Sequence, residues 1–107
     1  MVEIEKIKSQ IVQALMPLKP DKIILFGSYA YGTPNEESDI DLFLIKNDLS
    51  TQDIKEYELK AHVSVRELIR KYHIGFDILV DTMQNIQKRE DYFHKVDILR
   101  KGKILNG

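Results

Sequence analysis

The chain reads GSYAYG at residues 27–32 and SDIDL at residues 38–42, and these two motifs decide its fold. The apolar run at residues 23–26 leads into Gly27, which predicts a strand that ends in a tight turn. Glycine lets backbone N–H groups approach an anion closely, and the hydroxyl of Ser28 adds another donor. The first motif is therefore typical of a turn that can hold phosphate.

The second motif places carboxylates on a strand. Residues 39–45 read as a strand, and side chains alternate between the two faces of a strand, so Asp39 and Asp41 point to the same face. Another apolar segment, at residues 75–80, carries Asp77 between Phe and Ile. Aspartate is depleted in strands, which indicates that these side chains border a cleft. For Asp39 alone, an ordinary solvated strand end stays open as the alternative.

A bound cation explains these carboxylates best. Three carboxylates that converge without a cation would repel one another and raise their own pKa values. Mg²⁺ prefers hard oxygen ligands and shares them with substrate phosphates. We therefore expect Asp39, Asp41 and Asp77 to form a metal site. Asp81 is a weaker candidate, because the strand is expected to end there and its side chain to cap the next turn.

Composition limits the classes of function. A length of 107 residues predicts one domain spanning residues 1–107. Sixteen basic and 17 acidic residues leave a net charge of -1, so we expect no direct binding to nucleic acid, which usually needs a basic surface. There is no cysteine, which excludes thiolate metal sites. No apolar run is long enough to cross a bilayer and the start does not read as a signal peptide, so we expect a cytoplasmic protein without a membrane partner.

Periodicity and turn residues predict the other elements. Apolar residues spaced by three and four predict a first helix over about 3–16, which Pro17 and Pro20 close. The spacing of Ser50 and Asp53 predicts a capping box at the start of one long helix that reaches Tyr72. The remaining expected elements are strands at 22–26, 39–45, 75–80 and 102–105, a short helical turn at 29–31, and a helical segment at 86–100 with a break near 90–91.

This order of elements predicts an α+β (α/β) fold, a small mixed sheet with helices packed on it. The pairing of the first two strands stays open, because the link between them contains the short helical turn.

The motifs together resemble a known family. Gly27-Ser28, Ala30, Gly32, the SDIDL motif and the later Asp77 are similar to the pattern of the nucleotidyltransferase superfamily that includes DNA polymerase β. Within it the chain most resembles the minimal nucleotidyltransferases (MNT) of prokaryotes, over nearly its whole length. One departure is Tyr31, which stands where the family usually has arginine. Loss of that arginine would reduce affinity or activity if it holds phosphates or a partner.

The resemblance implies a reaction and its site. A hydroxyl attacks the α-phosphate of a nucleoside triphosphate such as ATP, and pyrophosphate leaves. Two Mg²⁺ ions assist, one at the attacking oxygen and one at the leaving group. By analogy Asp39 and Asp41 bind both ions, and Asp77 binds the catalytic ion nearest the attacking hydroxyl. Gly27 and Ser28 then hold the β- and γ-phosphates.

The resemblance also implies a partner. Minimal members are commonly encoded beside a HEPN-domain toxin, and they act as antitoxins that adenylylate the toxin, on a tyrosine where this is known. We therefore expect a hetero-oligomer with a HEPN toxin and transfer of AMP to it. The alternative is a non-catalytic antitoxin that neutralises its partner by binding alone. The base preference and the acceptor residue stay open.

Overall fold

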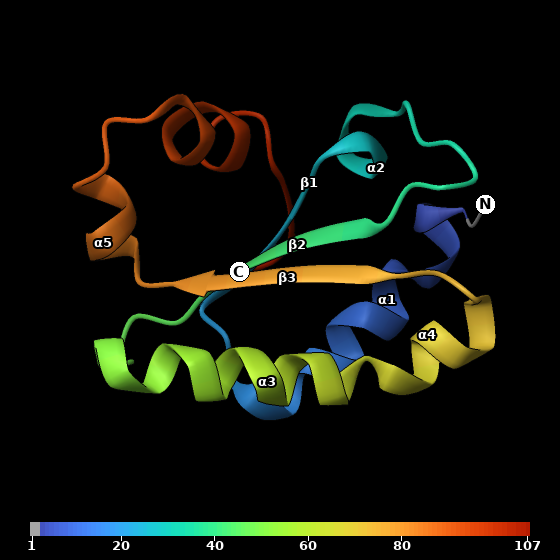
Figure 1. The fold of residues 1–107 in the computed structure, drawn as a ribbon, viewed down its shortest axis with the longest axis horizontal. Helices are drawn as coiled ribbons and strands as arrows, with labels where there is room; N and C mark the ends of the chain where they lie inside the picture. The colour runs from blue at the N-terminus through green and yellow to red at the C-terminus, as the bar shows by residue number, and fades with distance from the viewer. Residues whose placement is uncertain (1–2) are drawn as a thin grey trace.

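A four-stranded mixed sheet in the order β3-β2-β1-β4 organises the chain (Figure 1). The computed structural model describes residues 3–107. The strands are β1 Lys22–Phe26, β2 Ile40–Ile45, β3 Phe76–Asp81 and β4 Lys103–Asn106. The α-helices are α1 Ile4–Leu15, α2 Ser28–Tyr31, α3 Ile54–Ser64, α4 Arg66–Tyr72 and α5 Met83–Gln87. Short 3₁₀ segments are η1 Met16–Leu18 and η2 Thr51–Asp53, and η3 Phe93–Ile98 is a π-helix.

The strand pairing answers the question that the sequence leaves open. β1 and β2 pair antiparallel, although α2 lies in the link between them. β2 and β3 pair parallel, as a connection through the helices α3 and α4 allows. β4 pairs antiparallel with β1 at the edge of the sheet, with an irregularity between Ile23 and Ile24. The predicted mixed sheet with packed helices is confirmed.

Helices cover both faces of the sheet. α1, α3 and α4 lie together on one face, the lower one in Figure 1. Ile7, Ile11 and Leu15 of α1 are buried there, because residues four apart share one side of a helix. α5 and η3 lie on the other face. Between these helices and the sheet lies a second hydrophobic core of six buried residues, namely Ile24, Phe26, Phe43, Ile45, Ile86 and Ile98.

The prediction of one long helix that reaches Tyr72 is wrong in one respect, because the structure divides this segment into α3 and α4. Val65 joins the two with φ -95° and ψ 2°, outside helical geometry. The hydroxyl of Ser64 donates to the carbonyl oxygen of Lys60 at 2.9 Å. Such bonds to the preceding turn bend helices, which accounts for the division.

The expected capping box is also wrong. Ser50 does precede the helical segment, but its hydroxyl donates to a carboxylate oxygen of Asp53 at 2.8 Å. The backbone N–H of Asp53 donates instead to the carbonyl oxygen of Ser50 at 3.0 Å, which forms the 3₁₀ turn η2. The side chains of Ser50 and Asp53 thus hydrogen-bond to each other, and neither accepts from a free N–H group at the start of the helix.

The end of β3 agrees with expectation in part. The strand ends at Asp81, and its buried carboxylate accepts from the N–H of Thr82 and the amide of Asn85, both at 2.8 Å. Thr82, however, is the residue that caps α5, since its hydroxyl accepts from the N–H of Asn85 at 3.1 Å. Asp81 therefore supports the turn, and the break before η3 falls where the sequence predicts it.

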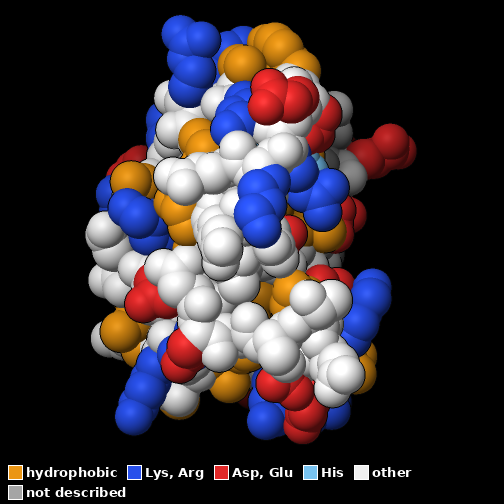
Figure 2. Space-filling model, turned by 90° about the vertical axis from the view of Figure 1, so that its left-hand side faces the viewer, with side chains coloured by type: hydrophobic (Ala, Val, Ile, Leu, Met, Phe, Trp, Pro, Cys, Tyr) orange, Lys and Arg blue, Asp and Glu red, His pale blue; other side chains and the backbone are white. Residues whose placement is uncertain are grey.

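The surface carries charges of both signs. On the face shown in Figure 2, acidic and basic side chains alternate with apolar and uncharged ones and form no broad basic patch. Over residues 3–107, no helix is both long and apolar enough to cross a membrane.

Candidate active site

Register brings two of the expected carboxylates side by side. Asp41 of β2 lies opposite Asp77 of the parallel strand β3. On its other side Asp41 lies opposite Phe26, the last residue of β1. Asp39 directly precedes β2. The side chains of Asp39 and Asp77 are exposed, whereas that of Asp41 is half-buried. The three aspartates therefore gather at one end of the central strands, where the residue before β2, the start of β3 and the end of β1 meet.

The environment of Asp41 disfavours its charge. Burial, followed by the nearby carboxylates of Asp77 and Asp39, raises the pKa of Asp41 to about 6. Both causes penalise the ionised carboxylate, one by removing water and the other by repulsion. Perturbed carboxylates of this kind concentrate at functional sites.

The carboxylates suit a hard divalent cation in chemistry. Their oxygens are the ligands that Mg²⁺ prefers, and a cation would offset the repulsion at Asp41. In the part of the chain that the structure describes, however, no three His, Cys, Asp or Glu side chains converge closely enough to hold one ion. Ion binding would therefore require these side chains to turn toward one another.

Two glycines make room for the carboxylates. Gly27 has φ +74°, and a Cβ atom there would collide with the carboxylate of Asp41. A Cβ atom at Gly75 would lie 2.5 Å from Oδ1 of Asp39. The turn at Gly27 thus passes against Asp41, and Gly75 lets the chain pass against Asp39. None of the sequence motifs points to Gly75 as a site residue, although a glycine directly before the strand of Asp77 is a signal that could have revealed it.

The turn leads directly into the one-turn helix α2. The N–H groups of Ala30 and Tyr31 donate to the carbonyl oxygen of Gly27 at 3.0 and 3.2 Å. Tyr29 and Ala30 are buried, while Ser28 is half-buried. Gly32 ends the helix with φ +76°. The sequence predicts a short helical turn at 29–31, and the helix observed begins one residue earlier, at Ser28. This helix places Ser28 next to the turn that touches Asp41.

Residues from the C-terminal part of the chain contact α2, the helix that follows the turn. The hydroxyl of Tyr31 donates to Oδ1 of Asp97 in η3 at 3.3 Å. Nζ of Lys101 donates to the hydroxyl of Tyr92 at 3.0 Å and lies 5.6 Å from the centre of that ring. Burial and then the charge of Asp97 raise the pKa of Tyr31, whereas the charge of Lys101 acts in the opposite direction. These four residues form one cluster, which we call the η3 cluster, and the sequence motifs do not reveal it.

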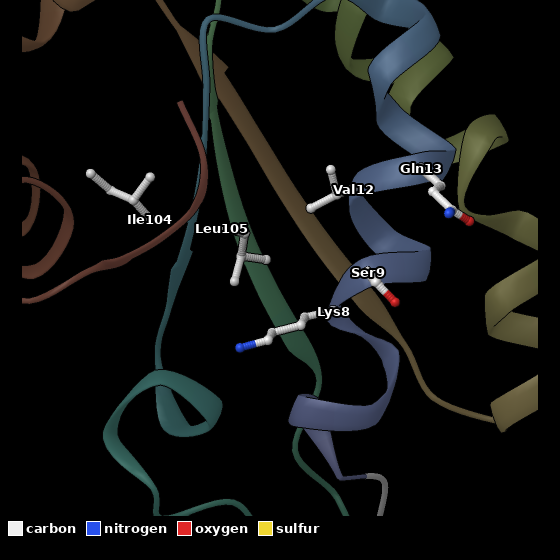
Figure 3. A pocket seen from close by; sticks show the side chains of 6 residues that line it. All are labelled: Lys8, Ser9, Val12, Gln13, Ile104 and Leu105. Atoms are coloured by element: carbon white, nitrogen blue, oxygen red, sulfur yellow. The ribbon is translucent and has the colours of Figure 1, made fainter.

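Two surface hollows lie away from the carboxylates. One, of about 440 Å³, lies between α1 and β4 (Figure 3). Its lining residues are Lys8, Ser9, Val12, Gln13, Ile104 and Leu105. The other, of about 480 Å³, lies beside α3 and includes Leu59 and Val63. We place the candidate site at the aspartates, because neither hollow carries comparable chemistry.

Relatives with similar sequences share a provisional name. One protein of Methanocaldococcus jannaschii, provisionally named a protein adenylyltransferase, is 32% identical over 79 residues, which are 74% of this chain and 73% of that protein. A second protein of that organism, with the same provisional name, is 33% identical over 84 residues, 78% of this chain and 76% of its own length.

Solved structures share the fold. A crystal structure of a toxin–antitoxin with AMP-PNP matches 94% of this chain and 73% of that chain, with a TM-score of 0.61 and 23% identity. A mutant of the toxin–antitoxin MntA-HpeT matches 94% of this chain and 72% of its own, with a TM-score of 0.60 and 19% identity. The family model described as the nucleotidyltransferase domain matches residues 4–105. The chain therefore belongs to the nucleotidyltransferase domain family.

Proposed function

We propose that this chain is a Mg²⁺-dependent adenylyltransferase that transfers AMP from ATP to a toxin partner and so acts as its antitoxin. The observation that carries the proposal is the turn at Gly27, which lies against Asp41 where Asp41 faces Asp77. A phosphate-binding turn beside paired carboxylates is what nucleotidyl transfer needs. The names of the relatives and the toxin–antitoxin structures of the same fold support the proposal.

Each site residue has a distinct role in this proposal. The backbone of Gly27 and the hydroxyl of Ser28 orient the β- and γ-phosphates of ATP. Asp39, Asp41 and Asp77 would hold the Mg²⁺ ions, with Asp77 on the side of the acceptor. Bound Mg²⁺ would neutralise the phosphate charge and lower the pKa of the acceptor hydroxyl. The acceptor oxygen bonds to the α-phosphorus as the bond to pyrophosphate breaks, and the hydroxyl proton leaves to water beside the exposed Asp77.

The acceptor is proposed to come from a HEPN-domain toxin. Asp39 and Asp77 are exposed, so a macromolecular acceptor can reach the carboxylates from solvent. A tyrosine hydroxyl fits this role, because a nearby metal ion can activate it for attack on phosphorus. The chain and its toxin would then form a hetero-oligomer in the cytoplasm, with residues 1–107 as one catalytic domain.

A binding-only antitoxin is the second candidate. It is favoured by Tyr31, which stands where the family usually has arginine and which donates to Asp97. A chain with a weakened phosphate site could still cover a toxin and block it. The intact set of Asp39, Asp41 and Asp77 favours the enzyme over this alternative.

Labelled ATP distinguishes the two candidates. The purified chain is mixed with the toxin encoded beside it, Mg²⁺, and ATP labelled at either the α- or the γ-phosphate. We expect the toxin to retain the α-label and not the γ-label, and EDTA to prevent retention. Asp41→Asn should abolish labelling, whereas the exposed charge-matched control Glu90→Gln should not. Inhibition of the toxin without retained label would support the binding-only antitoxin.

A further inference from the structure

The phosphate-binding turn lacks a cation of its own. Between Lys22, the first residue of β1, and Lys46 the sequence contains no lysine or arginine, although this stretch supplies the rest of β1, the turn, α2 and β2. It does contain Glu36 and Glu37 besides the aspartates of the site. A triphosphate brought to this turn would meet carboxylates and metal ions, but no basic side chain from the same stretch. A basic side chain at its outer phosphates would therefore come from another part of the fold.

The η3 cluster brings such a side chain to α2. Ser28 and Tyr31 are three residues apart on α2, so they lie on the same side of that helix. Tyr31 donates to Asp97, and Lys101 follows Asp97 by four residues, three residues beyond the end of η3. The N–H of Lys101 donates to the carbonyl oxygen of Val96 at 2.8 Å, a π-type bond that fixes its backbone on the last turn.

We propose that Lys101 binds the outer phosphates of the nucleoside triphosphate held by the Gly27–Ser28 turn, and so supplies the positive charge that α2 lacks. This inference rests on the proposed function and names a further residue of its nucleotide site. Lys101 is exposed, and the hydroxyl of Tyr92 accepts from one of the three N–H donors of its ammonium group. An ammonium held in this way is a compact charge suited to phosphate.

The neighbouring groups set the charge state of this ammonium. The hydroxyl of Tyr92 is the main cause that raises the pKa of Lys101, and Tyr31 and Asp97 act in the same direction. These contacts therefore favour the protonated form of Lys101. Asp97 offsets part of its positive charge while it accepts from Tyr31. Removal of the charge of Asp97 should consequently strengthen phosphate binding, and removal of Lys101 should weaken it.

Calorimetric titration of the purified chain with ATP, ADP and AMP, each with Mg²⁺, tests the proposal. We expect Lys101→Met to weaken ATP binding about five- to tenfold, as loss of one charge-assisted contact would. ADP binding should fall less, and AMP binding should not change. Lys103→Met, which removes the lysine two residues further on, is the matched control and should leave ATP affinity unchanged. Asp97→Asn should bind ATP as tightly as the wild type or more tightly.

The outcomes separate this inference from the proposed function. Equal ATP affinity of Lys101→Met and the wild type would overturn the role of Lys101 and leave the proposed function intact. An equal loss for ATP and AMP would also overturn it, because the contact would not be to the outer phosphates. A wild-type chain that binds no ATP with Mg²⁺ would contradict the proposed function itself. Thermal melts of each variant establish that it is folded in these titrations.

Discussion

Asp41→Asn should stabilise the metal-free protein at neutral pH. Burial, together with the charges of Asp77 and Asp39, raises the pKa of Asp41 from its ordinary value of 3.8 to about 6. A carboxyl group with a raised pKa in the folded state favours folding while it is protonated. That contribution is fully present below about pH 4, and it is lost as the pH rises through about 6. Asparagine keeps the shape of the side chain and carries no charge at any pH.

The size of the effect follows from the shift. A shift of roughly two pKa units corresponds to about 3 kcal/mol before any correction. Asp41 is only half-buried, so solvent screens much of this energy, and we expect a net gain of about 1 kcal/mol. For a domain of this size such a gain raises Tm by about 4–8 °C.

Thermal melts in EDTA from pH 4 to pH 8 measure this effect. Asp41→Asn and the wild type should melt together near pH 4 and diverge as the pH rises through 6. Glu90→Gln, an exposed carboxylate between α5 and η3, is the control for loss of one charge and should follow the wild type. Addition of Mg²⁺ and ATP should stabilise the wild type and not the variant. If Asp41→Asn were clearly less stable than the wild type at pH 7 in EDTA, the carboxylate would have a structural role and the reasoning would be refuted.

Three further predictions concern the site and its support. Gly27→Ala should remove ATP binding and lower stability by about 1–3 kcal/mol, because φ is +74° and the new Cβ atom meets Asp41; normal ATP affinity in a titration would contradict this. Phe43→Ala should cost about 3–5 kcal/mol in urea unfolding, since this fully buried ring fills the core under η3, and a loss below 1 kcal/mol would show that the core collapses around the gap. Asp77→Asn should abolish AMP transfer with an unchanged circular dichroism spectrum, whereas near wild-type transfer would remove Asp77 from the site.

Local pattern in the sequence was sufficient to predict the strands. Lys22–Phe26 forms β1 with the expected bounds, because an apolar run lies between Pro20 and the positive φ of Gly27. The division of the helical segment into α3 and α4 at Val65 could not be predicted from local pattern. The apolar stripe continues across it, since both α3 and α4 pack on the same face of the sheet, and the bend depends on a hydrogen bond of Ser64.

The part of the site that could be predicted from the sequence is the part that follows from the alternation of side chains along one strand. Alternation alone places Asp39 and Asp41 on one face, but it says nothing of which residue lies opposite Asp41. That neighbour, Asp77, is set by the parallel register of two strands separated by two helices. The contribution of Asp97 and Lys101 depends on how η3 packs near α2, and no local spacing encodes such a contact between distant segments.

Intact-mass spectrometry of the toxin shows whether the chain transfers AMP. The purified chain, the toxin encoded beside it, ATP and Mg²⁺ are incubated together, and the toxin is then weighed. We expect the toxin to gain the mass of one or more AMP units with the wild-type chain and with Glu90→Gln, and to gain no mass with Asp41→Asn. A toxin that keeps its original mass while the wild-type chain inhibits it stoichiometrically would show that the chain is a binding-only antitoxin.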